Sequence, residues 1–419
     1  MPAYAYTVRD TAGAMRSGTS EAENPDVLAR RLREQGFVIS EIKAAKAKKG
    51  SQGNLMERIQ RVKLTELSIF CRQFSTMIDA GVSLVRCLAV LQEQQSNPKL
   101  KRIIGDIQKE VESGSSLSKG MAKYPKVFNN LFIGLVRAGE VGGVLEETLQ
   151  RLSTFLEKDV EMRRKIKSAL TYPQIVMSAA LLIVCGLCTF IVPTFINLFV
   201  TMLPHGKADF PALTLGLVAF SDFLIHKSYI VVALIIAFRF GLASFRKTEF
   251  GGHAFDKFIL KVPVFGKLIH KVALARFART LGTLLTSGVP ILQALETVAG
   301  VVDNLIISDA LMEARARIRE GDRIGDPLVK SKLFPPMVVQ MISIGEESGS
   351  LDGMLAKVAD FYEDEVDAAV AQLAVAIEPI LIVGLGTAVC LIVLGMFMPM
   401  VVLIQSLSSG DGTEKGQGE

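Results

Sequence analysis

Two long stretches without a charged residue constrain the fold of this chain more than any other feature. Thirty-seven residues without a formal charge separate Lys167 from His205, and 32 separate Glu378 from Asp411. About 20 apolar residues are enough for a helix to cross a bilayer. Each stretch therefore predicts a membrane span, and the first has length left for a buried or interfacial extension. The mean hydropathy of +0.37 is likewise too high for an ordinary soluble protein.

A third apolar run, YIVVALIIAFRFGLASF at residues 229–245, is shorter and contains Arg239. That side chain is close enough in sequence to Arg246 and Lys247 to extend toward the same side of a membrane. We therefore predict a third span here.

The distribution of Lys and Arg predicts the orientation. Segments 1–167 and 246–378 hold most of the basic residues, whereas segment 201–227 has two lysines offset by two aspartates. Positive charge stays on the cytoplasmic side. We expect both large segments and the N-terminus in the cytoplasm, with a short hairpin and the C-terminus in the periplasm. One conflict remains, because the flank before the last span is acidic (residues 363–367), and the direction of that span follows from continuity alone.

The chain contains an internal repeat. At an offset of 207 residues, Phe70 matches Phe277 and Gly81 matches Gly288. After a one-residue deletion the offset is 206, and Phe128 then matches Phe334. The register continues into the membrane through Pro173 and Pro379, and through Pro193 and Pro399. The duplicated unit is thus a polar domain of about 105 residues plus the span that follows it. The unpaired run at 229–245 returns the second polar domain to the side of the first.

Each polar domain has the pattern of a helical bundle. Phe70, Phe74, Met77 and Ile78 recur at helical spacing. DAGVS and TSGVP then provide a glycine helix end followed by a new start. Similar breaks predict about six helices in each copy, the last of which leads into the membrane.

The first 43 residues follow a different pattern. AYAYTV alternates, DTAG favours a turn, residues 25–35 have helical spacing, and FVISEI is typical of a strand. We predict a small α+β module, followed by the basic linker KAAKAKKGSQG. The predicted fold class is a mainly α integral membrane protein with two repeated six-helix cytoplasmic bundles, three transmembrane helices and a small N-terminal α+β module.

A Gly-Glu-x-x-Gly motif occurs once in each copy. A structural interpretation makes it a glycine helix end, with the Glu near the N-terminal dipole of the next helix. A functional interpretation makes it a surface turn that docks a partner. Catalysis is disfavoured because no His, Cys or Lys accompanies the Glu. The partner-contact candidates are Gly139, Glu140, Gly143, Gly345, Glu346 and Gly349.

Other chemistry is disfavoured by spacing. The acidic residues at 363–367 do not converge on one point of a helix, so a solvated face is favoured over a cation site. Cys185 and Cys188 lie in an uncharged run, which favours packing over redox or metal chemistry. GSSLSKG at 114–120 lacks the Gly-Lys-Ser/Thr order of a phosphate loop. We expect no catalytic residue, no metal and no cofactor, and the absence of Trp disfavours a nucleic-acid partner.

Two Xaa-Pro pairs, Tyr172-Pro173 and Glu378-Pro379, mark where each repeat reaches the membrane. Proline there predicts a kink or a restart of the helix. For Glu378, an interfacial position is favoured over a buried functional pair.

The combined motifs resemble a known family. The first copy carries FCRQFSTMIDAGVSL, KVFNNLF and AGEVGGVL, the second carries LARFARTLGTLLTSGVP and IGEESGSLD, and VPVFGK precedes it. Over residues 1–405 the chain is similar to the PilC/GspF family, the inner-membrane platform proteins of type IV pili and type II secretion. The sequence motifs of the first repeat are more similar to those of the pilus branch.

The resemblance implies a non-enzymatic role. It implies that cytoplasmic hexameric ATPases engage the polar domains for assembly, with retraction as a further role, and that their motion adds or removes pilin subunits. Implied partners are these ATPases, pilin, other inner-membrane alignment proteins, further copies of the chain and the lipid bilayer. On the basis of this resemblance we hypothesise that the N-terminal module and first bundle contact the ATPase, while the spans guide the pilin helix.

The sequence leaves two other functions open. A type II secretion platform protein F is the alternative within the family, and a small-solute transporter lies outside it, although few charges within the spans offer no substrate path. The predicted organisation is: 1–43 N-terminal module; 44–63 basic linker and lead-in; 64–167 first bundle; 168–200 first span; 201–227 periplasmic hairpin segment; 228–245 second span; 246–270 cytoplasmic connector; 271–377 second bundle; 378–404 third span; 405–419 periplasmic tail.

Overall fold

The computed structural model describes residues 3–9, 15–21, 24, 27, 29–30, 38–44, 61–201, 210–263 and 265–410. Its contacts divide the chain into two compact units. One contains residues 1–63 and 89–105, and the other contains residues 64–88 and 106–419.

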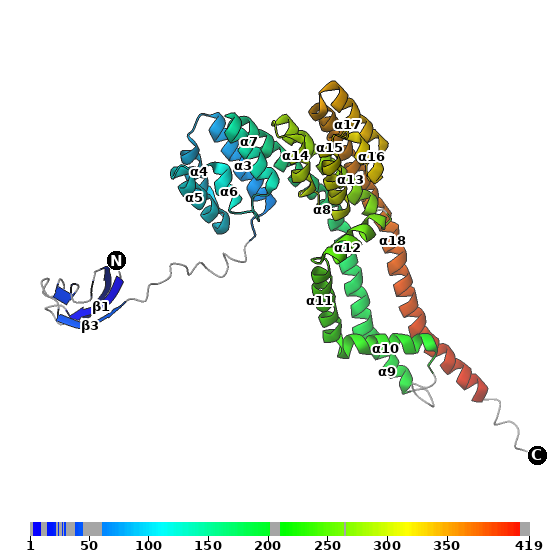
Figure 1. Ribbon diagram of the computed structural model, residues 1–419. Coiled ribbons are helices and arrows are strands. Elements are labelled where there is room, and N and C mark those ends of the chain that lie inside the picture. The colour runs from blue at the N-terminus through cyan, green and yellow to red at the C-terminus, as the bar shows by residue number, and fades with distance from the viewer. Residues whose placement is uncertain are drawn as a thin grey trace, which may run out of the picture. The chain divides into compact units, whose positions relative to one another are not determined.

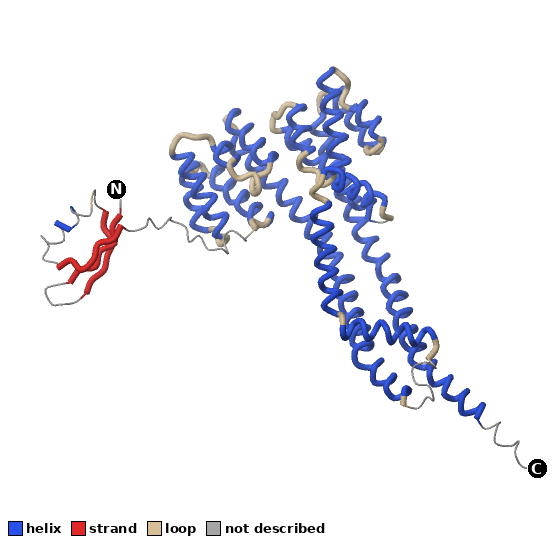
Figure 2. The backbone as a smooth tube through the Cα atoms, turned by 60° about the horizontal axis from the view of Figure 1, so that its bottom comes forward, coloured by secondary structure: helices blue, strands red, loops and turns tan. Residues whose placement is uncertain are grey.

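The N-terminal residues form a three-stranded antiparallel sheet. Its strands are β1 (Ala3–Arg9), β2 (Met15–Glu21) and β3 (Val38–Ala44), in the order β2-β1-β3. Figure 2 shows them in red. Strands β1 and β3 coincide with the two segments whose pattern predicts strands, whereas β2 was not anticipated. The predicted helix at 25–35 and the basic linker lie largely outside the described residues.

Six helices follow in the first repeat and six in the second. The first set is α3 (Leu64–Asp79), α4 (Leu84–Gln94), α5 (Pro98–Glu112), α6 (Leu117–Ala122), α7 (Asn130–Gly142) and α8 (Leu145–Gly186). The second set is α13 (Phe265–Thr286), α14 (Ile291–Ala299), α15 (Leu305–Glu320), α16 (Gly325–Ser331), α17 (Pro336–Ser348) and α18 (Leu351–Gly410).

The two sets break at equivalent glycines. Gly81 and Gly288 both have φ +77°, and the later pairs Gly114/Gly321 and Gly143/Gly349 also lie in the left-handed region. Only glycine adopts this conformation without a steric penalty. The helix ends predicted from the repeat are therefore set by backbone geometry.

Aromatic side chains fill equivalent places in the two cores. Phe128 packs on Phe132 with ring centroids 4.9 Å apart, and Phe334, its repeat equivalent, packs on Phe277 at 5.1 Å. Edge-to-face pairs of this kind add to the free energy gained from burial alone. In the first repeat α3 and α7 pack on α8, and in the second α13 and α17 pack on α18.

Two helices are long and apolar enough to cross a membrane. One runs from Leu145 to Val200 and the other from Leu351 to Gln405. The first consists of α8, one π-helical turn η1 (Leu187–Ile191) and α9 (Val192–Val200). Both α8 and α18 continue through their prolines, so the predicted helix restart at Pro173 and Pro379 is not seen. In Figure 1 these long helices lead away from the bundles.

Between the first long helix and the second repeat the chain forms three shorter helices. These are α10 (Ala212–His226), α11 (Ser228–Phe245) and α12 (Glu249–Lys261). Helix α10 packs on η1, α9 and α18 and crosses between them (Figure 1). Thr214 Oγ1 donates to the carbonyl oxygen of Gly395 at 2.7 Å, and Ser221 Oγ donates to that of Cys188. Segment 201–227 thus contains an apolar helix, α10, that is hydrogen-bonded to both long helices. Its side of the membrane stays a prediction.

Of the two cysteines of this region, Cys188 lies in an apolar cluster and Cys185 is half-buried. Cys188 is buried with Val192, Ile196, Phe210 and Ile392, and both Cys185 and Cys188 are free thiols. Their place in the structure agrees with the packing interpretation.

Helix α12 is anchored to the second repeat by a histidine. His253 Nδ1 lies 2.7 Å from the Glu249 carbonyl oxygen, and Nε2 lies 2.7 Å from Asp309 Oδ2 on α15. The Glu249 carbonyl and then the Asp309 carboxylate raise the pKa of His253. The charged imidazole therefore stabilises the folded state.

This contact predicts a pH-dependent stability. Because the folded-state pKa of His253 is raised, its contribution is complete below the unfolded value of about 6.5 and is lost as pH rises through the folded value. We expect His253→Gln to lower the melting temperature at pH 5.5 and to have little effect at pH 9. Melting in detergent at both pH values, beside Asp309→Asn, is the measurement. An equal loss at both would contradict the assignment.

Candidate functional site

The Gly-Glu-x-x-Gly motif joins three helices in each repeat. In the first copy, both carboxylate oxygens of Glu140 accept backbone N–H groups at the start of α6, from Leu117 and, at 3.1 Å, from Ser118. In the second copy, Glu346 accepts the N–H of Ile324 at 3.0 and 3.2 Å, at the start of α16. The first N–H groups of a helix have no partner within it, and a carboxylate satisfies them and the dipole. The Glu therefore reaches back to cap an earlier helix.

The first glycine of the motif allows two helices to touch. A Cβ on Gly139 would lie 2.0 Å from Thr148 Oγ1, and one on Gly345 would lie 2.8 Å from the Cα of Leu351. The last glycine ends the helix, with φ +68° at Gly143 and +70° at Gly349. Each residue of the motif thus has a structural task, and partner contact by these six residues stays a prediction.

The surface of the first turn is apolar. Gly139 is buried and Glu140 half-buried, whereas Val141 is 85% exposed and Val144 45% exposed. A partner that docks here would touch the two valines. The repeat gave no signal for these valines, because their equivalents in the second copy are Glu347 and Ser350.

Close helix contact at Gly139 predicts a large effect of one methyl group. We expect Gly139→Ala to lower the free energy of unfolding by about 1–3 kcal/mol, the usual cost of overpacking. Gly134→Ala on the same helix is the matched control, because no atom lies within 4 Å of its Cβ position, and alanine there should be neutral or stabilising. Chemical denaturation of the purified protein measures both. Similar effects of the two substitutions would show that Gly139 is not at a tight contact.

The two repeats also meet along a charged seam, where α8 faces α13 and α18. Its cations come from α8 and α13, and its anions come from α8, α18 and the turn before α15. The charged seam comprises Lys158, Asp159, Glu161, Arg163, Lys165, Arg276, Arg279, Asp303, Asp360, Glu363 and Asp367.

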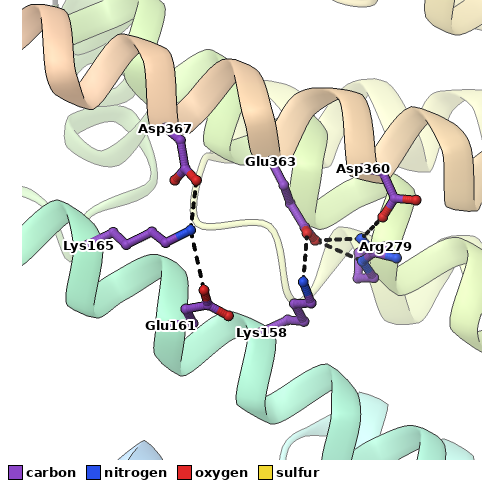
Figure 3. Close-up of polar contacts among 7 residues, drawn as sticks. All are labelled: Lys158, Glu161, Lys165, Arg279, Asp360, Glu363 and Asp367. Carbon is purple, nitrogen blue, oxygen red and sulfur yellow. Dashed lines mark hydrogen bonds and ion pairs between the residues drawn. The ribbon is translucent and has the colours of Figure 1, made fainter.

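The basic flank of α8 pairs with the acidic flank of α18 (Figure 3). Lys165 Nζ lies 2.7 Å from Asp367 Oδ2, and Lys158 Nζ lies 3.8 Å from Glu363 Oε2. The acidic residues before the last apolar stretch are therefore balanced by neighbouring cations. This pairing gives a physical reason for the acidic flank that conflicted with the charge rule in the sequence analysis.

Arg279 forms an ion pair of the seam that has an equivalent in the first repeat. Its Nε donates to Glu363 at 2.8 Å, as Arg72 Nε, its equivalent in the first copy, donates to Glu157 at 2.7 Å. In the second copy Asp360 joins at 2.5 Å. Burial lowers the pKa of Arg279, but the bonds to Glu363 and Asp360 outweigh it and the net shift is upward. The inherited pair has thus been extended to the neighbouring repeat through Lys158.

Arg276 is the buried centre of the seam. It is 8% exposed, with Nη2 3.1 Å from Asp159 Oδ1 on α8 and Nη1 paired with Asp303. Asp159 Oδ1 makes this ion pair without a well-aligned hydrogen bond, and Arg276 Nε has no hydrogen-bond partner. Incompletely satisfied buried charges recover only part of their desolvation cost. The ion pairs of Arg276 therefore determine which residues meet between the repeats, although they recover only part of the cost of burying the charge.

A cavity adjoins the seam. It encloses about 330 Å³ and is lined by side chains of α8, α13 and α18, among them Gln150, Thr154, Thr283 and Asp352. An incompletely filled space of this kind allows small changes in side-chain contacts between the repeats at a lower cost than a close-packed core would.

Among the described residues, no group of three or more His, Cys, Asp or Glu side chains is arranged so that it could hold a metal ion. Glu363 and Asp367 face cations and are half-buried, so this part of the acidic cluster is paired rather than simply solvated. Of the membrane-interface candidates, Tyr172, Glu378 and Pro379 are exposed and Pro173 is buried.

Arg276 should matter more to stability than a surface arginine. Removing one partner of a buried pair leaves an uncompensated charge, which costs about 3–5 kcal/mol. We expect Arg276→Met to approach that loss and Arg72→Met, an exposed pair, to stay within about 1 kcal/mol. Denaturation of both variants and of Asp159→Asn/Arg276→Met tests this. The double variant should recover part of the loss, and additive losses would contradict the pairing.

Comparison with known proteins places these features in a family. The profile of the type II secretion system protein F family matches twice, at residues 70–193 and 277–399, and that of its N-terminal domain matches residues 1–43. The chain belongs to the type II secretion system protein F family. The two matches have the register of the internal repeat, and each includes the start of an apolar stretch.

Relatives in this family carry two kinds of name. Type IV pilus assembly protein PilC of Thermus thermophilus is 42% identical over 97% of the chain and all of the relative, and that of Myxococcus xanthus is 38% identical over 96% and 94%. Type II secretion system protein F of Vibrio cholerae is 32% identical over 97% of the chain and all of the relative.

Proposed function

We propose that the chain is the inner-membrane platform protein of a type IV pilus machine. The observation that carries this proposal is that two relatives named as pilus assembly proteins are 42% and 38% identical to the chain, whereas the relative named as a secretion protein is 32% identical. The alignments cover nearly the full chain. Platform protein F of a type II secretion system is the second candidate, supported by the same family membership.

The proposed topology has three spans. Residues 1–167 and 246–378 lie in the cytoplasm, with α11 as the middle span, the N-terminus in the cytoplasm and the C-terminus in the periplasm. The basic residues of the two large segments support this orientation. The 18 residues of α11 extend about 27 Å at 1.5 Å per residue, close to the hydrocarbon thickness.

The proposed mechanism is transmission of a push. A cytoplasmic hexameric ATPase engages the N-terminal module and first repeat, and its motion is passed to the membrane by α8 and α18. These helices have 42 and 60 residues, so each is continuous from a bundle into the apolar stretch. The charged seam joins α8 to α18 at residues that precede their apolar stretches. A movement of one repeat would therefore be transmitted to the other.

The proposed partners follow from this mechanism. Pilin contacts the apolar helices, which guide its own transmembrane helix into or out of the fibre. Further inner-membrane alignment proteins and other copies of the chain complete the base of the machine. The role requires no catalytic residue, metal or cofactor in this chain.

Deletion of the gene tests the proposal. We expect loss of surface pili with a normal set of secreted proteins, and recovery of pili when the wild-type gene is supplied on a plasmid. Electron microscopy of the surface and a profile of secreted proteins in the same strain are the measurements. Intact pili with secretion substrates held in the periplasm would assign the chain to type II secretion. Intact pili and normal secretion would contradict both.

A further inference from the structure

Helix α12 presents an apolar and basic face that no neighbouring helix covers. Phe250, Ala254, Lys257, Phe258 and Lys261 recur at i, i+4, i+7, i+8 and i+11 of this helix, and all five are exposed. Phe250 is 81% exposed and Phe258 68% exposed. Two exposed phenylalanines about two helical turns apart, with two lysines on the same face, are unusual on a surface that meets only water.

Contacts of the opposite face of α12 determine the rotation of the helix about its own axis. A Cβ on Gly252 would lie 2.8 Å from Leu305 Cδ1, so the helix approaches the start of α15 closely. Asp256 accepts the backbone N–H of Leu305 at 2.8 Å, and His253 binds Asp309. At the corner with α11, the Arg246 guanidinium lies 4.3 Å above the ring of Phe255. Because these contacts hold the helix against α15, rotation cannot bury Phe250 and Phe258.

The exposed charges around α12 have one predominant sign. Among the described residues from 246 to 267, the exposed acidic side chain is Glu249, because Asp256 is buried. Exposed phenylalanines extend the apolar surface to both sides of the helix, at Phe245 and Phe265. The exposed basic side chains are Arg246, Lys247, Lys257, Lys261 and Lys267.

The position of α12 in the chain brings this face close to the bilayer. Helix α11 ends at Phe245 and α12 begins at Glu249. The three residues between them span at most about 11 Å. The headgroup layer adds roughly 5–8 Å to each side of the hydrocarbon core, so the first turn of α12 is within reach of it.

We propose that α12 is an interfacial helix, with Phe250 and Phe258 inserted at the headgroup boundary of an anionic bilayer and Lys257 and Lys261 at its phosphates. The proposal rests on α11 crossing that bilayer. Insertion removes the apolar surface of the two phenylalanines from water, and it brings the two lysine charges close to an anionic surface that attracts them. A water-facing surface would leave both gains unused.

An interfacial α12 would set the height of the second repeat. Its buried face is hydrogen-bonded to α15 through Asp256 and His253. These contacts would hold the bundle at a fixed distance from the membrane surface. The second repeat would then be fixed to the bilayer by α12 as well as by α18.

The absence of Trp from the chain allows a direct test with single-tryptophan variants. Phe250→Trp and Phe258→Trp, each in the full-length protein, are placed in vesicles of anionic phospholipid whose acyl chains carry bromine at either a shallow or a deep position. We expect shallow bromine to quench both, and more strongly than deep bromine. The matched control is Val329→Trp on α16 of the same repeat, which is 58% exposed and should not be quenched.

Phe238→Trp within α11 separates this proposal from the proposed topology. It should be quenched by deep bromine. Quenching of Phe238→Trp without quenching at Phe250 or Phe258 would overturn the interfacial helix and leave the span intact. Absence of quenching at all three would show that α11 does not cross the bilayer and would overturn both.

Charge reversal tests the anionic headgroup. Lys257→Glu/Lys261→Glu should reduce quenching at Phe250→Trp in anionic vesicles. Lys330→Glu/Lys357→Glu, which changes two exposed lysines elsewhere in the second repeat, should leave it unchanged. Equal quenching in all variants would remove the phosphate contact from the proposal. Absence of lipid quenching at Phe250→Trp and Phe258→Trp would instead indicate that a protein, and not the bilayer, occupies this face.

Discussion

The pairing of opposite charges between α8 and α18 determines how the two repeats fit together. Duplication gave the chain two long helices at equivalent positions, but one has a basic flank and the other an acidic flank. Lys165 and Asp367 meet at 2.7 Å, and Arg276 links Asp159 to Asp303 within the same seam. Two basic flanks would repel each other at this short distance. The difference in sign allows the helices to lie together, and it accounts for an acidic segment where the charge rule favours a basic one.

The repeat also explains why the Gly-Glu-x-x-Gly motif occurs twice. Gly139 and Gly345 allow close helix contact, Glu140 and Glu346 cap α6 and α16, and Gly143 and Gly349 end α7 and α17. A substitution at any of these positions would disturb a turn on which three helices converge. The doubling therefore needs no ligand to explain it, although the exposed valines at 141 and 144 leave room for a partner in the first copy.

Local features were predictable from the sequence, and contacts distant in the chain were not. Glycines with left-handed backbone conformation, such as Gly81 and Gly288, end helices, and the signal for this lies within a few residues of sequence. The spacing of Phe70 and Phe74 likewise predicted a helix face that is buried. The register of the repeat gave the order of the helices. The Glu140 contact with α6 and the Arg276 contact with Asp159 join residues that are separated in sequence by 23 and 117 positions, and no local pattern encodes them. The prediction at Pro173 was wrong about a restart because the surrounding apolar helix continues despite one lost hydrogen bond.

The same structure suggests why a charged seam suits a protein that transmits motion. An apolar interface between the repeats would lose contacts steeply on displacement, because dispersion falls off within an ångström. Ion pairs decline more gradually with distance, and the cavity beside the seam gives side chains space to follow. The repeats can then shift slightly while α8 and α18 stay paired before the membrane. Helix α10 is hydrogen-bonded to α18 through Thr214 and to η1 through Ser221, which keeps the apolar ends of the two long helices together. A movement of the bundles would therefore tilt these ends jointly and would not separate them.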